Sequence, residues 1–122
     1  MKTLTRDDIL NISDIKIESI DIPEWGGKVY VRTMSGKERD ALEAGLSNLP
    51  EATRMINARA KYAALSVCDK GGKLLFTSAD LGKLGAKCAS ALDKIFEYCL
   101  KHNKITEKDF EDTVKNLESG QS

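Results

Sequence analysis

The chain has 122 residues, of which 41% are apolar and 31% charged, so it can bury one hydrophobic core and is most simply a single domain over residues 1–122. Nineteen acidic residues balance nineteen basic ones, which argues against a dedicated nucleic-acid-binding protein with a basic surface. The longest apolar runs are far shorter than the about 20 residues of a membrane span, which argues against a membrane partner.

Residues 1–34 predict a short capped helix followed by a β-hairpin. Thr5 and Asp8 form a capping-box pattern. The isoleucines that follow alternate in two phases, which indicates a strand with a β-bulge near residues 18–19. Residues 23–27 form the turn, because paired glycines reach positive φ without steric cost, and residues 28–32 form the return strand.

Five further helices are predicted after the hairpin. Ser35 and Glu38 form a capping box that begins a helix ending near Asn48. The next helix has Pro50 in its first turn and an apolar stripe that runs through Val67. A Gly-rich loop follows at residues 69–73, and then a very short strand at 74–76. A short helix begins at Ser78 and stops at Gly82 or Gly85.

The strongest helix carries Cys88, Leu92, Ile95 and Cys99 on one stripe, and its basic end at residues 101–104 suits the helix dipole. A last helix over residues 106–117 and a polar, disordered tail over residues 118–122 complete the chain. These patterns predict an α+β fold, namely a mostly α-helical single domain with an N-terminal β-hairpin.

No catalytic, metal or cofactor site is indicated. His102 is the only histidine and suits a helix end, and Cys88 and Cys99 are interpreted as buried apolar residues too far apart to share an ion. The loop that begins at Asp69 lacks the ligand positions of a calcium loop. Three cysteines without a C-x-x-C pair, and an N-terminus without a signal peptide, favour a reduced cytoplasmic protein. The chain is therefore expected to act by binding, not as an enzyme.

Trp25 and Tyr30 are the candidate partner-binding residues. Trp25 is the only tryptophan, and its indole either closes the hairpin against the core or remains partly exposed as an anchor for a protein partner. Tyr30 points away from Val29 and Val31 on the return strand, so it can join Trp25 on a binding surface. Part of the apolar surface of the helices can instead be an oligomer or partner face.

In pattern and order the chain resembles the tail assembly chaperones of long-tailed, siphovirus-type bacteriophages. The resemblance covers residues 5 to 117 and contains no catalytic fingerprint. It rests on the hairpin at residues 23–32, the first helix at 34–40, the run at 63–69, Leu75-Phe76, the short helix at 80–82 and the run at 89–96.

The resemblance implies a non-enzymatic protein that binds the tape measure protein, keeps it soluble and helps the tail tube polymerise around it. It also implies a possible contact with the major tail protein, possible homo-oligomers, a place in the host cytoplasm and absence from the mature virion. The alternative is a small structural tail or head–tail connector protein retained in the virion. A third reading is a small bacterial regulatory adaptor.

Overall fold

The computed structural model describes residues 1–47 and 50–105, with the backbone alone for residues 47 and 51–57. The predicted last helix at 106–117, the tail at 118–122 and Asn48 lie outside this part of the chain. Within it the elements run in the order α1 (Arg6–Asn11), β1 (Ile17–Ile22), η1 (Pro23–Trp25), β2 (Gly27–Arg32), α2 (Gly36–Ser47), α3 (Glu51–Ala64), β3 (Val67–Cys68), η2 (Ser78–Asp80), α4 (Leu81–Gly85) and α5 (Ala89–His102). The predicted fold class, mostly helical α+β with an N-terminal hairpin, is confirmed.

The hairpin is regular, and the predicted bulge was wrong. Glu18 pairs with Val31 and Ser19 with Tyr30, with no extra residue on either strand. Ile20 and Ile22 face the core, whereas Ile17 lies on the opposite face of the sheet. The isoleucines of the two phases therefore lie on opposite faces of the sheet, so no bulge is needed to place them on one face.

The turn of the hairpin needs a single glycine in the left-handed region. Gly26 has φ 70° after the 3₁₀ turn, and its N–H donates to the carbonyl of Pro23 at 3.0 Å. Gly27 is already the first residue of β2. The turn was therefore predicted at the right place, but positive φ, which was predicted for both glycines, is found at Gly26 and not at Gly27.

A third strand replaces the predicted last turn of α3, which is a correction. The helix ends at Ala64, and Val67 pairs with Val31 on β2, giving an antiparallel sheet in the order β1-β2-β3. The N–H of Arg32 donates to the carbonyl of Ser66 at 2.8 Å. Residues 66–68 therefore form hydrogen bonds with the edge of β2 and do not continue the helix. Val67 is buried as expected, but in a strand. The predicted strand at 74–76 is reduced to a single bridge between Leu74 and Cys68.

The two capping boxes and the short helix were predicted correctly. The N–H of Asp8 donates to Thr5 Oγ1 at 3.2 Å, and that of Glu38 donates to Ser35 Oγ at 3.1 Å. The η2–α4 segment ends at Gly85, one of the two predicted stops. Pro50 is the N-cap of α3, one position earlier than the first turn.

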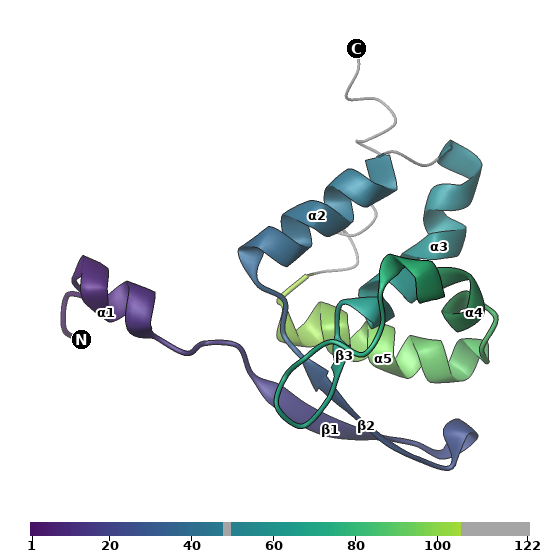
Figure 1. Ribbon diagram of the computed structural model, residues 1–122, viewed down its shortest axis with the longest axis horizontal. Coiled ribbons are helices and arrows are strands. Elements are labelled where there is room, and N and C mark those ends of the chain that lie inside the picture. Colours follow the sequence, from purple (N-terminus) through teal and green to yellow (C-terminus); the bar gives the residue numbers. More distant parts are fainter. Residues whose placement is uncertain (48–49, 106–122) are drawn as a thin grey trace.

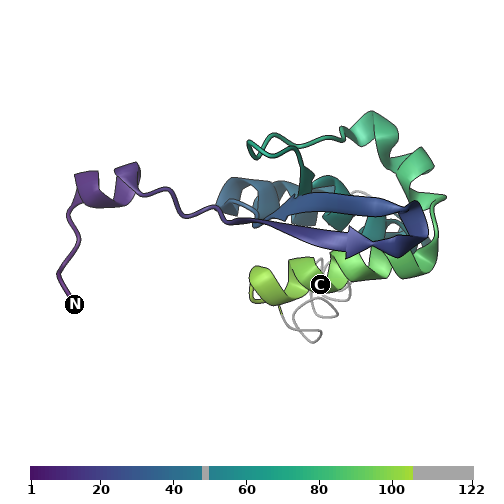
Figure 2. The ribbon, with the colours of Figure 1, turned by 90° about the horizontal axis from the view of Figure 1, so that it is seen from below.

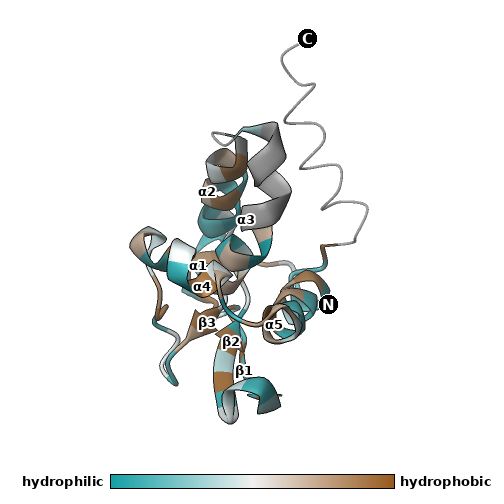
Figure 3. Cartoon of the chain, turned by 90° about the vertical axis from the view of Figure 1, so that its right-hand side faces the viewer, coloured by the Kyte–Doolittle hydropathy of each residue, from teal (hydrophilic) through white to brown (hydrophobic). Residues whose placement is uncertain are grey.

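The helices pack on one face of the hairpin (Figures 1 and 2). One buried cluster joins the sheet to α3, α4 and α5, and it includes Val31, Ala63 and Ile95. A second cluster joins α2, α3 and the C-terminal half of α5 around Leu46 and Cys99. Hydrophobic and hydrophilic stretches alternate along the hairpin strands and α2 in Figure 3, as expected for elements with one buried side. Only α1 stands away from this body.

Candidate functional site

Trp25 lies at the tip of the hairpin, where η1 contacts α5. Its side chain is half-buried and packs against the buried cluster beneath the sheet. This position fits the first of the two interpretations, in which the indole closes the hairpin against the core. The part that stays exposed leaves room for a contact with a partner, which remains a prediction.

Glu24 ties the hairpin tip to α5. Its Oε1 accepts from Lys94 Nζ at 2.7 Å and its Oε2 accepts from Ser90 Oγ at 2.6 Å. The hydrogen bond from Lys94, and then that from Ser90, lower the pKa of the Glu24 carboxyl to about 2. The tip is therefore fixed on α5 by an ion pair. Local sequence patterns could not predict it, because Glu24 and Lys94 lie 70 positions apart in the chain.

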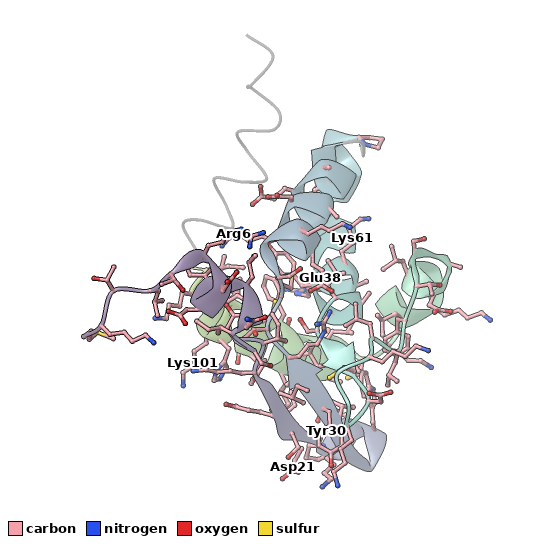
Figure 4. All side chains as sticks on the ribbon, turned by 60° about the vertical axis from the view of Figure 1, so that its left-hand side comes forward. Arg6, Asp21, Tyr30, Glu38, Lys61 and Lys101 are labelled. Carbon is pink, nitrogen blue, oxygen red and sulfur yellow. The ribbon has the colours of Figure 1, made fainter. Side chains whose placement is uncertain are left out.

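Tyr30 lies on the other face of the sheet, so the structure does not bring it together with Trp25. It pairs with Ser19 on β1 and Cys68 on β3, and its ring is half-exposed. Lys28 Nζ lies 5.6 Å from the centroid of the ring. In Figure 4 the Tyr30 side chain lies near Asp21 on the hairpin and far from Lys101 of α5. We call Ile17, Ser19, Lys28 and Tyr30 the outer hairpin face.

The loop after β3 borders this face. Asp69 Oδ1 accepts the N–H groups of Gly71 and Lys73, each at 2.9 Å, so this carboxylate holds the turn of the loop. Gly72 has φ 93°, and a Cβ there would lie 3.0 Å from Ile17 Cδ1. The outer hairpin face therefore has the Tyr30 ring at its centre, opposite Ser19, and Ile17 at the end that the loop borders.

A small apolar groove opens between α2, the end of α3 and the η2–α4 segment. It has a volume of about 180 Å³, and Lys61 is the one charged residue among those that line it. Sequence patterns could not find this groove, because three segments far apart in the chain form it. The lining residues are Ala41, Leu42, Lys61, Ala64, Leu65, Phe76, Thr77, Ser78 and Leu81.

His102 ends α5, as predicted, and stacks on Tyr98 with ring centroids 4.0 Å apart. Its Nε2 lies 3.9 Å from Glu18 Oε2. It also borders a more polar hollow of about 520 Å³ between the start of α2 and the end of α5. In that hollow Asn103 joins the end of α5 to the segment before α2, because its Oδ1 accepts the N–H of Met34 at 2.7 Å.

The cysteines divide into two kinds, and the prediction for Cys88 was wrong. Cys99 is buried, and burial raises the pKa of its thiol to about 11. Cys68 is buried as well, and burial raises its pKa. Cys88 is exposed, because it is the N-cap of α5 and precedes the stripe that faces the core. Its hydrogen bond with Ser90 lowers the pKa of its thiol.

Over residues 1–47 and 50–105, no group of three or more His, Cys, Asp or Glu side chains is placed to hold a metal ion. Nor does that part of the chain contain a helix of the length and hydrophobicity needed to cross a membrane.

No protein-family model matches the chain, and no curated protein matches it. Among solved structures, the tail assembly chaperone of bacteriophage HK97 has a similar fold, with a TM-score of 0.57 and 19% sequence identity. The match covers 71% of this chain and 84% of that chain. At this level of identity the likeness shows a shared fold, and that fold is the one that the sequence resemblance implied.

Proposed function

We propose that this protein is a tail assembly chaperone of a long-tailed bacteriophage, which binds the tape measure protein, keeps it soluble and assists polymerisation of the tail tube. The observation that carries the proposal is the fold shared with the HK97 tail assembly chaperone over 71% of the chain. The sequence resemblance over residues 5 to 117 supports it independently of that comparison. In this role the protein is not an enzyme and needs no cofactor.

The outer hairpin face is the surface we assign to the tape measure protein. Tyr30 supplies an aromatic anchor and Ile17, which is 38% exposed, an apolar neighbour. Ser19 lies opposite Tyr30 and Lys28 lies over its ring, so both add polar groups beside the anchor. A central aromatic anchor with a polar rim is the usual anatomy of a protein-binding surface. A long helix with an apolar stripe can lie on such a face.

The proposal includes self-association and a place in assembly. Several copies bound along one rod gain avidity, and contacts between the copies increase it. The major tail protein is a second proposed partner, because the tube forms around the rod that the chaperone covers. The protein acts in the host bacterial cytoplasm and is absent from the finished virion.

The test is co-expression with the tape measure protein encoded in the same phage or prophage. We expect the tape measure protein to become soluble and to co-purify with the chain. Tyr30→Ala should weaken the complex at least about tenfold, as for an interface anchor. Lys101→Ala, a matched surface change remote from Tyr30 in Figure 4, should leave it intact. Trp25→Ala is measured beside its thermal melting curve, because this side chain also packs on the core.

Because proteins of the resembled family often have a longer second form made by ribosomal frameshifting, co-expression with any such form is the second arm of the test. An insoluble tape measure protein that does not co-purify in either arm would overturn the proposal. Mass spectrometry of purified virions separates it from the structural alternative. A chaperone is missing from the virion, whereas a tail or connector component is found there.

A further inference from the structure

The N-terminal arm, residues 1–16 with helix α1, exposes hydrophobic side chains that no other segment among residues 1–47 and 50–105 buries. Leu4 is 48% exposed, Ile9 57%, Leu10 64% and Ile12 48%, and α1 has no buried residue. In Figures 1 and 2 the arm points away from the body, and α1 lies at the opposite end of the long axis from α4.

Six residues of the arm nevertheless form the helix α1. Thr5 and Asp8 close a reciprocal capping box, in which the N–H of Thr5 donates to Asp8 Oδ2 at 3.0 Å. Helices as short as α1, with six residues, are marginal in water unless a surface packs on them. A capped helix with uncovered aliphatic side chains is what a docking segment requires before it meets its partner.

The groove between α2, α3 and the η2–α4 segment can receive such a side chain. Its volume is about 180 Å³, and an apolar cavity of about 150 Å³ holds a benzene-sized group. Lys61 lies among the lining residues, which are otherwise uncharged. On α1, Asp7 lies one turn before Leu10 and thus on the same side of the helix. Its carboxylate is 80% exposed and pairs with the equally exposed Arg6, a contact that is easily exchanged.

We propose that the N-terminal arm of one copy docks into the groove of a second copy, with Leu10 inside the groove and Asp7 paired with Lys61. A second copy is favoured over the same copy because the linker at residues 12–16 is short. Five extended residues span at most about 18 Å, and this linker leads the arm away from the body.

The arm and the groove are different surfaces, so the contact is heterologous. Each copy that uses its arm still offers a free groove, and association therefore continues beyond two copies unless the arrangement closes. This contact specifies the self-association within the proposed function, but it needs no tape measure protein. Its test therefore uses the purified chain alone, and its failure leaves the proposed binding of the tape measure protein standing.

The experiment is sedimentation velocity and light scattering on the full-length protein over a wide concentration range. We expect the mean mass to rise with concentration. Leu10→Asp should weaken association at least about tenfold, because a carboxylate would enter the groove. Leu75→Asp is the matched control, since Leu75 is 55% exposed and does not line the groove. It should associate like the wild type.

A charge exchange tests the register of the contact. Asp7→Lys and Lys61→Glu should each weaken association, by at most about fivefold for an exposed ion pair. The variant with both changes should regain the wild-type mass distribution. A chain that stays monomeric at every concentration overturns the proposal, as does undiminished association of Leu10→Asp. Single charge variants that the double variant fails to rescue overturn the Asp7–Lys61 pairing.

Discussion

Helices α1 and α5 differ in opposite directions in two properties, the cap at the N-terminus and the number of buried residues. Helix α1 has a complete capping box but buries no residue. Helix α5 has no side-chain cap at Cys88, yet it buries Ala91, Leu92, Ile95, Tyr98 and Cys99. Capping therefore decides where a helix begins, and burial decides whether the helix supports the fold.

The largest expected difference between the two helices is in the free energy of unfolding when one isoleucine of each is truncated. Ile95 is fully buried, so Ile95→Ala should lower the free energy of unfolding by about 2 to 5 kcal/mol. Ile9 is 57% exposed, so Ile9→Ala should change it by less than about 0.5 kcal/mol. Urea denaturation of both variants, at a concentration where the wild type is monomeric, measures the difference. Equal losses would show that the arm is part of the core.

Local signals predicted the fold well where the sequence itself supplies the partner. Both capping boxes, the hairpin and the stop at Gly85 each depend on residues within a few positions of one another. The end of α3 was missed because Val67 continues the helical spacing of buried residues while its hydrogen-bonding partner, β2, lies far away in the chain. Periodicity reports burial, and here it could not say whether a strand or a helix provides it.

The candidate site was less predictable than the fold for the same reason. The sequence identified Tyr30 and Trp25 as aromatic candidates, but the hairpin places them on different faces. The groove depends on contacts between α2, α3 and the η2–α4 segment, which no motif encodes. The sequence could not predict that the apolar side chains of the arm are exposed, because the same residues would also suit a helix end packed on the core.

A smaller effect is expected from removing the serine or threonine of each capping box. Ser35→Ala should cost about 1 kcal/mol, because α2 is packed and its Glu38 also pairs with Arg32 of the sheet. Thr5→Ala should fray α1 without changing the free energy of unfolding of the body. Thermal melting measures the first effect, and amide hydrogen exchange at residues 6–11 measures the second. A comparable loss of global stability in both variants would contradict the separation of arm and body.

The smallest effect should come from the hairpin tip, which is exposed like the arm but tied to α5 like the core. The pKa of Glu24 is lowered from 4.5 to about 2 by Lys94 and Ser90, so its ion pair contributes stability above pH 4.5 and loses it as the pH falls toward about 2. Glu24→Gln removes this contribution, and the stability difference between wild type and variant should therefore shrink as the pH falls from 4.5 toward about 2.

The arm offers the matched comparison. Hydrogen bonds with Thr5 lower the pKa of Asp8 as well, but these contacts lie within the arm. Because these contacts lie within the arm and do not involve the body, Asp8→Asn should leave the pH dependence of global unfolding unchanged. Acid titrations of urea midpoints compare the two variants. If Asp8→Asn alters the profile as much as Glu24→Gln does, the arm must be coupled to the body.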